Sequence, residues 1–543
     1  MIDRRTFLKG SFAASALAAG SAGLACDDGA QPPPDDGWRA GDLLHLIPTA
    51  SHERIRIKAS FERPRTKAPL LEAGAHRTAG QQSDSEGRFF SFDIAGLTPA
   101  TRYTLRLVEQ NGAPICDDWP LRTFPAPDAT PDRFRLLAFT CAGGPEDLYN
   151  FGFFNAYLPH PLRQRLFARA LSFEPDASIA NGDHVYWDLK SKFGWAMGRS
   201  PRAWWNAGFF DRDLPILGTK NEGVLQRAFG PQIGDLYGVR FRSTPSFFLQ
   251  DDHDYGENDE ASEELRTFPA DDFMVDLART TQRLYYPELL VDSTAPVPRM
   301  RGAASSGGLG ESFGALRYGR LFEALLYDCR RHLTNASDPL TGDSESGFVP
   351  RDVERWIVER VGGSDAVHLA QMPSTPVLWT AGKWGEWYPD ALDEQQSLRA
   401  DAHKPYWPLG WNEQHDRLVS ASAARSDRLP LFVSGDLHAI AAGHIHASNG
   451  KPLANPLLSI LCGPVGTGAL GWPSKFRGTV PLPSGSIAAE ERIAPIEENG
   501  FSLFDFTPDE MRVSFFRWTP DQPTEAIDAL EPFETLVFAK PGA

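Results

Sequence analysis

Two apolar segments that end abruptly in polar residues constrain this chain more than any other feature. The first spans residues 136–144 (LLAFTCAGG) and the second spans residues 177–186 (ASIANGDHVY). Short apolar runs of this kind are typical of buried parallel strands whose carboxyl ends open into loops. Cys141 ends the first predicted strand, and Asp183 and Tyr186 lie just past the second. Because ligands gather at the carboxyl edge of open α/β sheets, this thiol, carboxylate and phenol together predict a metal site.

The chain from residue 132 to residue 543 alternates strands with helical segments. Residues 161–171 have helical periodicity and separate the two opening strands, which predicts a right-handed βαβ unit in a largely parallel core. Further strands are predicted at 246–250, 321–327, 366–370, 429–434 and 457–461. Near the end, residues 501–506 and 511–516 alternate polar and apolar side chains, as antiparallel strands do. The predicted fold class of this region is therefore α/β.

Residues 43–125 show a different pattern, in which short alternating strands follow one another without helical segments. Such strands are predicted at 54–61, 88–94 and 102–108, and they favour an all-β sandwich. Residues 97–103 (LTPATRY) resemble the fibronectin type III pattern, in which a tyrosine fixes a corner between strands. Proline-rich linkers at 31–42 and 125–131 bound this domain. It contains no reactive set of residues, so we expect a structural or shielding role.

The N-terminus has the composition of an export signal. Arg4 and Arg5 precede Phe7-Leu8-Lys9 and an Ala/Gly-rich apolar segment, which together predict a twin-arginine signal peptide over residues 1–30. This route carries folded proteins, which suits a cofactor loaded before export, and we expect a periplasmic or secreted protein. Cys26 could instead carry a lipid and make the protein a membrane-anchored lipoprotein. Beyond the leader, no apolar run is long enough to span a bilayer.

Net charge and cysteine usage argue against several classes of protein. A formal net charge of −17 disfavours a nucleic-acid-binding surface, because phosphate backbones attract basic surfaces. It leaves open a small phosphorylated substrate, since bound cations would set the local field. Four scattered cysteines follow the leader, and their spacing fits neither a disulfide scaffold nor a zinc ribbon. Of these, Cys329 and Cys462 are expected to be buried packing thiols.

Metal-type donors follow four predicted strands of the α/β region. They are Cys141, then Asp183 with Tyr186, then Asp251-Asp252-His253-Asp254, and then Gly435-Asp436-Leu437-His438. Each alone has an ordinary structural interpretation, such as a Gly-Asp turn, a solvated acidic loop or a surface histidine. Their joint occurrence at four strand ends of one domain favours a shared metal centre.

This order of motifs resembles the alkaline phosphatase D family of metallophosphoesterases. The resemblance covers the chain from residue 134 onward, includes an Asp-x-Arg element at Asp328-Cys329-Arg330, and extends to the preceding sandwich. It implies a four-layer αββα metallophosphoesterase sandwich after a fibronectin-III/Ig-like domain. It implies Fe³⁺ held by Cys141, Asp183, Tyr186 and His438. Asp183 would bridge to a second ion, Ca²⁺ or another divalent cation, which Asp252 and Asp436 would also bind.

The chemistry of the donors agrees with this resemblance. Thiolate, phenolate and imidazole suit a transition metal, whereas carboxylates suit a hard divalent cation. Two cations roughly 3.5–4 Å apart can hold the attacking and leaving oxygens of a phosphoryl displacement. His253, beside Asp252, is placed to protonate the leaving oxygen or to stabilise the transition state. Arg330 could grip phosphate oxygens bidentately or form a structural ion pair, and both alternatives stay open.

Some positions depart from the family's pattern. No aspartate follows Cys141, and Asp254 replaces the commoner glutamate. Residues 218–223 are predicted to form a polar turn. Asn221 in that turn, or Asn258 after the acidic run, could supply an amide ligand.

Other histidines compete with the predicted ligands. His444 and His446 lie in a Gly-His-x-His sequence that matches the wider metallophosphoesterase superfamily. We prefer Asp436 and His438, because Gly435-Asp436 directly follows a predicted strand. His368 lies inside a predicted strand, which indicates a core residue or one that supports the site.

The sequence therefore predicts an exported phosphoesterase in which metal-activated hydroxide hydrolyses phosphomonoesters, phosphodiesters or both. Trp-rich stretches at 204–205, 379–387 and 407–411 are expected to wall the site and control substrate choice. One alternative is a phospholipase D-like phosphodiesterase. An alternative of a different class is a surface-binding protein with a degenerate catalytic domain.

Overall fold

The computed structural model describes residues 37–145, 156–189, 207–259, 267–290, 309–334, 347–381, 409–476 and 478–541, with Pro33 and short strands at 304–305, 391–392 and 398–399. The predicted signal peptide, including Cys26, lies outside the described residues, as do Trp204, Trp205 and Trp407. Within the described ranges, no helix is both long enough and apolar enough to cross a membrane.

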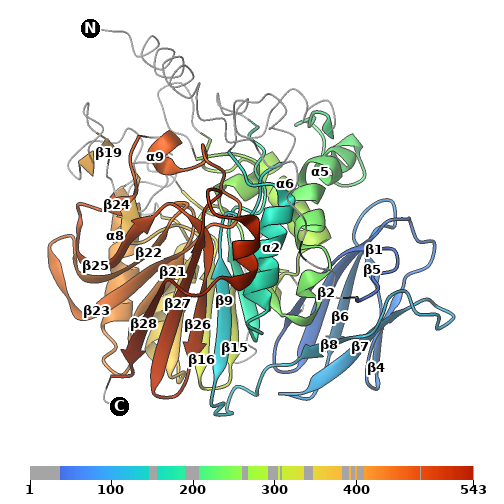
Figure 1. The fold of residues 1–543 in the computed structure, drawn as a ribbon, viewed down its shortest axis with the longest axis horizontal. Helices are drawn as coiled ribbons and strands as arrows, with labels where there is room; N and C mark the ends of the chain where they lie inside the picture. Colours follow the sequence, from blue (N-terminus) through green and yellow to red (C-terminus); the bar gives the residue numbers. More distant parts are fainter. Residues whose placement is uncertain are drawn as a thin grey trace, which may run out of the picture.

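The N-terminal strands form two four-stranded antiparallel sheets, drawn in blue in Figure 1. One contains, in spatial order, β1 (Leu43–Ala50), β2 (Arg54–Phe61), β6 (Phe89–Ala95) and β5 (Gln81–Gln82). The other contains β4 (His76–Ala79), β3 (Leu70–Ala73), β7 (Arg102–Val108) and β8 (Trp119–Arg122). Ile57, Phe92 and Leu105 belong to the apolar cluster that the two sheets share. The hydroxyl of Tyr103 accepts a 2.8 Å hydrogen bond from the backbone N–H of Thr98, within the predicted corner.

Two larger sheets form the α/β region. The six-stranded sheet has the order β11 (Ser246–Leu249), β10 (Ala177–Asn181), β9 (Phe134–Phe139), β26 (Asn499–Phe506), β27 (Glu510–Trp518) and β28 (Glu534–Ala539). The seven-stranded sheet has the order β15 (Phe313–Tyr318), β16 (Phe322–Tyr327), β17 (His368–Pro373), β21 (Leu431–Ser434), β23 (Lys451–Cys462), β22 (Ile440–Ser448) and β25 (Ile487–Ile496). The predicted α/β class is confirmed. Among the strands that the structure describes, β11-β10-β9 and β16-β17-β21-β23 pair in parallel and the others pair antiparallel, so the prediction of a largely parallel core is too broad.

Side chains alternate between two apolar clusters along each central strand. On β9, Leu136 packs with residues of the seven-stranded sheet such as Leu326, whereas its neighbour Leu137 packs with helical residues such as Leu277. On β16, Leu326 joins the cluster shared by the two sheets, and Leu325 joins a cluster with Ile357 of α7 (Arg351–Gly363). A strand buried on both faces must be apolar at consecutive positions, which explains the continuous apolar runs in the sequence.

The helices of the α/β region lie mainly on the outer sides of these clusters. They are α2 (His160–Leu171), α5 (Lys220–Gly230), α6 (Asp272–Tyr285), α7 (Arg351–Gly363), α8 (Leu409–Ala423) and the short α9 (Pro473–Phe476). Single-turn helices are η2 (Pro231–Asp235), η3 (Arg240–Ser243), η4 (Asp252–Tyr255) and η6 (Thr524–Ala529). The remaining strands are β12 (Leu289–Leu290), β13 (Ala304–Ser305), β14 (Leu309–Gly310), β18 (Trp379–Thr380), β19 (Ala391–Leu392), β20 (Leu398–Arg399) and β24 (Leu482–Pro483). The polar turn predicted at 218–223 is wrong, because the side chain of Thr219 caps α5 by accepting the N–H of Asn221.

A buried network of charges joins the sandwich to the α/β region. On β2, Nζ of Lys58 lies 3.0 Å from Oε1 of Glu288, and Nη2 of Arg56 lies 2.6 Å from Oε2 of the same carboxylate. On β1, Nε2 of His45 lies 2.6 Å from the carbonyl oxygen of Tyr285. Burial acts to raise the pKa of Glu288, but the two cations outweigh it and lower the pKa. Glu288 therefore ties β2 to the segment that follows α6.

We expect Glu288→Gln to lower the free energy of unfolding by about 3–5 kcal/mol, because it leaves the buried ammonium of Lys58 without its counter-charge. The control is Glu531→Gln, since the Glu531 side chain is 81% exposed and lies 3.5 Å from Arg169. We expect the control to change the free energy of unfolding by less than about 0.5 kcal/mol. Urea unfolding followed by tryptophan fluorescence measures both variants. If both variants changed the free energy of unfolding equally, Glu288 would not stabilise the contact between the sandwich and the α/β region.

Candidate metal centre

The predicted metal ligands lie in loops at the carboxyl ends of four strands. Cys141 follows β9, Asp183 follows β10, Asp252 opens η4 after β11, and Asp436 and His438 follow β21. Of the seven non-glycine residues with positive φ in the described part of the chain, four are Cys141, Asp183, Asp436 and His438, with φ between 48° and 67°. Such backbone costs about 1–3 kcal/mol per residue and persists only where the surrounding structure enforces it. The strained backbone is thus concentrated in the loops that carry the predicted ligands.

Two glycines allow these loops to approach one another. At Gly182, where φ is +79°, an added Cβ would lie 2.7 Å from the Cβ of Asp251. At Gly435, an added Cβ would lie 2.2 Å from Oγ1 of Thr140 and 2.6 Å from the carbonyl oxygen of Asn181. The Asn181 amide also donates to the carbonyl of Pro373 at 3.1 Å, which links the edges of the two sheets. Larger side chains at either glycine would push these edges apart.

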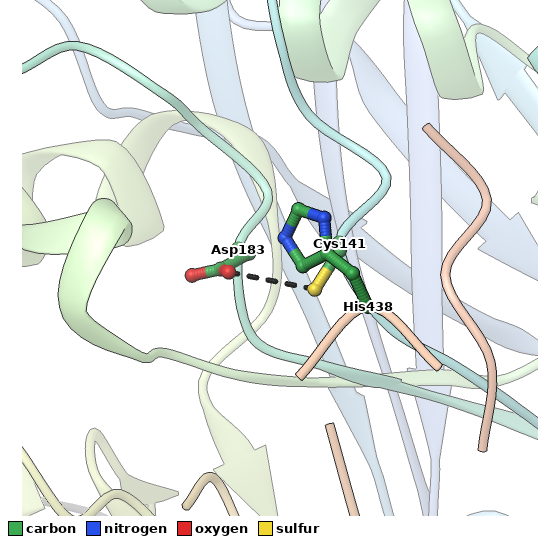
Figure 2. Close-up of side chains that lie close together, drawn as sticks. All are labelled: Cys141, Asp183 and His438. Carbon is green, nitrogen blue, oxygen red and sulfur yellow. Dashed lines mark hydrogen bonds between the residues drawn. The ribbon is translucent and has the colours of Figure 1, made fainter. Parts of the chain in front are cut away.

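A thiol, a carboxylate and an imidazole converge at the first half of the site. Figure 2 shows Cys141, Asp183 and His438 together, and one potential ligand atom from each lies within 4.8 Å of the other two. Sγ of Cys141 lies 3.4 Å from Oδ2 of Asp183. The same Oδ2 accepts the hydroxyl of Tyr186 at 3.0 Å, and that hydroxyl lies 3.0 Å from Nε2 of His438. The four residues expected to hold one cation are therefore brought together.

Carboxylates dominate the second half of the site. Asp183, Asp252 and His253 form one potential ligand group, and Asp251, Asp252 and Asp436 form another. Asp183 thus belongs to both the thiol-containing group and a carboxylate-containing group. Asp251 is not among the predicted ligands, although it begins the acidic run that follows β11 after Gln250.

Burial and mutual repulsion disfavour charge on the uncomplexed ligands. Burial, followed by the charges of Asp252 and Asp251, raises the pKa of Asp183 well above its usual range. Burial raises the pKa of Asp251 to about 7, although Arg330 opposes the shift. Burial likewise raises the pKa of the Cys141 thiol and of the Tyr186 phenol well above their usual ranges. Bound cations would reverse these preferences, because metal ligands bind in deprotonated form.

Arg330 lies inside the acidic half of the site. Its guanidinium lies 2.6 Å from Asp251, 3.0 Å from Asp259 and 3.5 Å from Asp436, and its side chain is 0% exposed. Asp328 accepts the backbone N–H of Arg330 at 2.6 Å, which explains the Asp-x-Arg spacing. These contacts favour the structural ion-pair alternative over a phosphate grip.

Asp254 holds two ligand-bearing loops together. Its carboxylate accepts backbone N–H groups of Asp183 at 2.8 Å, His184 at 2.9 Å and Asp251 at 2.9 Å. Burial raises the pKa of Asp254 to about 8, and the three backbone donors oppose that shift. Asp254 therefore fixes the geometry of the two loops.

Two polar side chains that sequence reasoning missed support the predicted ligands. Oε1 of Gln232, in the π-helical turn η2, accepts the backbone N–H groups of Gly144 and Tyr186, both at 2.8 Å. Oγ1 of Thr467 lies 3.0 Å from Nδ1 of His438. Thr467 follows β23, so the strand-end rule could have found it. Gln232 has no comparable signal, because its partners are backbone groups remote in sequence.

Several other candidates have structural partners instead. The Asn221 amide is engaged by the backbone of Asp211, Leu214 and Pro215. For Asn258, the backbone carbonyl accepts the hydroxyl of Thr267 at 2.6 Å, and its side-chain amide stays a predicted ligand. His444 and His446 lie within the antiparallel strand β22, and His446 is 3.9 Å from Glu490. Cys329, Cys462 and His368 are buried, as predicted. Nε2 of His368 lies 2.7 Å from the carbonyl oxygen of Thr507.

Comparison with known proteins gives a structural counterpart that matches over most of the chain. No family model and no curated protein matches the sequence. A solved structure described as the structure of PhoD has a TM-score of 0.60 and 13% identity, covering 94% of this chain and 92% of its own. This chain has the fold of PhoD. The resemblance expected from the sequence is thereby confirmed at the level of the fold.

Two further solved structures are much less similar than PhoD. A putative alpha amylase from Salmonella typhimurium aligns at 10% identity over 72% of this chain and 65% of its own. The type III pullulan hydrolase from Thermococcus kodakarensis aligns at 9% identity over 73% and 60%. Both TM-scores are 0.13, which is too low to indicate a shared fold.

We expect Asp254→Asn to lower the free energy of unfolding by about 2 kcal/mol and to reduce the metal content of the purified protein. An asparagine must present its NH₂ group to backbone donors, which leaves buried N–H groups unsatisfied. The control is Asp84→Asn in the sandwich, where the carboxylate accepts backbone N–H groups of Gly87 at 3.0 Å and Arg88 at 2.9 Å. Plasma mass spectrometry should find less metal only in the Asp254 variant. Full occupancy in both would show that loop geometry does not depend on Asp254.

Proposed function

We propose that this chain is a metal-dependent phosphoesterase of the alkaline phosphatase D family. In this proposal the α/β region is the family's four-layer αββα sandwich, and the N-terminal strands form a fibronectin type III-like domain. The PhoD-like fold and the convergence of donors at four strand ends support it. We further propose export by the twin-arginine route, supported by Arg4 and Arg5 in the leader.

The observation that carries the proposal is the shared carboxylate of Asp183. It stands between a thiol, phenol and imidazole on one side and further carboxylates on the other. The first set fits a transition metal such as Fe³⁺, and the second fits Ca²⁺ or another hard divalent cation. Oδ1 of Asp183 is buried and has no hydrogen-bond partner in the described ranges, so its lone pairs are available to a cation. When bound, the cations would supply a water of lowered pKa and neutralise phosphate oxygens.

The chain's own residues orient the donors and handle protons. In the tautomer whose Nδ1–H donates to Oγ1 of Thr467, 3.0 Å away, His438 would direct the lone pair of Nε2 toward the cation site. Gln232 holds the backbone of the Tyr186 loop against that of the Cys141 loop. Arg330 offsets part of the negative charge of the acidic half. His253, 4% exposed at the edge of this set, would donate the proton that the leaving oxygen needs.

The proposed substrates are phosphomonoesters, phosphodiesters or both. Both classes have non-bridging oxygens that a pair of cations can bind and a leaving oxygen that a histidine can protonate. A phospholipase D-like preference for lipid diesters would be a special case of the same chemistry. Of the Trp-rich stretches expected to set this choice, Trp379 and Trp411 are buried core residues. Both belong to an apolar cluster that includes Ile357 of α7, so they do not line an open surface.

We expect the native protein to contain iron and to absorb visible light, because a phenolate bound to ferric iron gives a charge-transfer band. Tyr186→Phe should remove most of this absorption. The control is Tyr237→Phe, because the Tyr237 hydroxyl is buried and has no hydrogen-bond partner in the described ranges. An absorption spectrum with parallel metal analysis measures both variants. A colourless wild-type protein fully occupied by another metal would refute the iron assignment.

Activity tests the proposal as a whole. We expect the wild-type protein to hydrolyse 4-nitrophenyl phosphate, bis(4-nitrophenyl) phosphate or both. Loss of a partner that merely supports a metal ligand costs about 10- to 100-fold, so Asp183→Ala should lower kcat/KM by more than about 100-fold. A purified protein that lacks metal and hydrolyses neither ester would instead favour the surface-binding alternative.

A further inference from the structure

The two loops that follow β9 and β10 meet at a point where their backbones cannot bond to each other directly. Closer to the strands they do pair, because the N–H of Cys141 donates to the carbonyl of Gly182 at 3.1 Å, and a second bond of 3.0 Å follows two residues later. Farther along, Gly144 and Tyr186 both present N–H groups toward the same place. Two donors cannot bond to one another, so the loops need a shared acceptor there.

The side chain of Gln232 is that acceptor. Its Oε1 accepts the N–H groups of Gly144 and Tyr186, both at 2.8 Å. Its Nε2 donates to the carbonyl oxygen of Tyr186 at 3.2 Å and to that of Ala228 at 2.9 Å. Gln232 is 0% exposed, and its amide uses both hydrogens of the NH₂ group and both lone pairs of the oxygen. Because a backbone N–H only donates and a carbonyl only accepts, these partners fix the orientation of the amide.

A rare backbone conformation presents this amide to the loops. Gln232 is the second residue of the π-helical turn η2, which directly continues α5 and begins at Pro231. Proline has no N–H to donate, and its ring interrupts the regular hydrogen bonds of the preceding helical turn. π-Helical turns are uncommon and occur frequently at functional sites. The helical geometry at Gln232 therefore points to a role beyond packing.

We propose that Gln232 is a positioning residue that sets the place of the Tyr186 phenol relative to the Cys141 thiol. The inference rests on the proposed metal-dependent phosphoesterase function and adds a residue to it. One side chain holds both the N–H and the carbonyl of Tyr186, so this residue has little freedom to move its backbone. The same oxygen binds Gly144, three residues after Cys141, and so fixes the spacing of the two loops.

The surroundings of the Tyr186 ring explain why a small displacement of its backbone would matter. The hydroxyl lies 3.0 Å from Oδ2 of Asp183 and 3.0 Å from Nε2 of His438. The centroid of the ring lies 4.9 Å from that of Tyr157 and 4.2 Å from that of His253. Because the ring is confined between aromatic neighbours, a shift of the backbone moves the hydroxyl within the ligand set.

The loop after β9 has equally little freedom. At Gly144, where φ is +113°, an added Cβ would lie 2.2 Å from Cδ1 of Tyr157. At Gly143, an added Cβ would lie 2.5 Å from the carbonyl oxygen of His184. Without the amide of Gln232, two buried N–H groups would lose their acceptor in loops that have no room to rearrange. The loops would then separate until water could reach those groups.

The test compares Gln232→Met with the matched control Gln414→Met. Gln414, in α8, is also buried, and its Oε1 accepts the backbone N–H groups of Phe348 at 2.8 Å and Val349 at 3.1 Å. Its Nε2 donates to the carbonyl of Val349 at 2.7 Å. Segment 347–349 carries none of the proposed metal ligands. Both variants lose the same kind of hydrogen bonds, and we expect both to lower the midpoint of thermal unfolding.

Only Gln232→Met should change the metal centre. We expect its affinity for iron, measured by competition with a chelator, to fall about 10- to 100-fold, as is typical when a group that supports a metal ligand is lost. The visible absorption band should shift or weaken at equal iron occupancy, because the phenol is displaced. In a Tyr186→Phe background the same substitution should cost less iron affinity, since no phenol remains to be positioned.

Hydrogen exchange tests the bridge without relying on iron or on activity. In the protein as purified, mass spectrometry should find faster exchange of the Gly144 and Tyr186 amides in Gln232→Met and unchanged exchange of both in Gln414→Met. If Gln232→Met does not fold, Gln232→Glu replaces it. The carboxylate still accepts both N–H groups but cannot donate to the carbonyl of Tyr186, so exchange should stay slow while iron affinity falls.

Failure of the inference can be distinguished from failure of the proposed function. A wild-type protein that holds no iron and hydrolyses neither ester contradicts the function. Unchanged exchange at Gly144 and Tyr186 in Gln232→Met refutes the bridge whatever the activity of the wild type. An active, iron-containing wild type whose Gln232→Met and Gln414→Met variants have the same iron affinity and spectrum leaves the function intact and refutes the positioning role.

Discussion

Crowding of buried carboxylates is the constraint on which the site depends. Asp183, Asp251, Asp252 and Asp436 lie at one sheet edge, none of them more than 6% exposed. Arg330 offsets part of that charge through its contacts with Asp251 and Asp436. Isolated charges at such depth are unstable, so they must be protonated or paired with cations. The carboxylates therefore lack enough positive charge around them, and burial raises the pKa values of the Cys141 thiol and the Tyr186 phenol. Bound metal cations would neutralise the carboxylates and favour the deprotonated thiol and phenol.

The sequence predicts the parts of the fold that depend on local patterns. The strands that precede Cys141 and Asp183 are predictable because side chains buried on both faces must be apolar. Antiparallel neighbours such as β22 and β25 were harder to foresee, because pairing across distant segments leaves no local signature. The helix α5 was missed because its capping residue, Thr219, lies in a glycine-rich polar segment that also suits a turn.

The candidate site divides in a similar way. Metal ligands at strand ends can be predicted from the sequence, because the topology brings strand ends to one edge of a sheet and the side chain determines which metal it can bind. Supporting residues such as Gln232 and Asp254 bind backbone N–H groups, and any acceptor at the right place could do so. The contacts of Arg330 likewise depend on Asp259, which no strand end marks. Such supporting roles can be recognised only once the positions of the atoms are known.

The two sheets contribute different ligands, which gives bound cations a structural role as well. Cys141 and Asp183 belong to loops of the six-stranded sheet, whereas Asp436 and His438 follow a strand of the seven-stranded sheet. A cation held by both sets would cross-link the sheets at the edge where Gly435 and Asn181 already bring them into contact. Because the unfolded chain offers no such preformed site, the free energy of binding would add to the free energy of unfolding. The strained, positive-φ backbone of the ligand loops would then be sustained partly by the cations themselves.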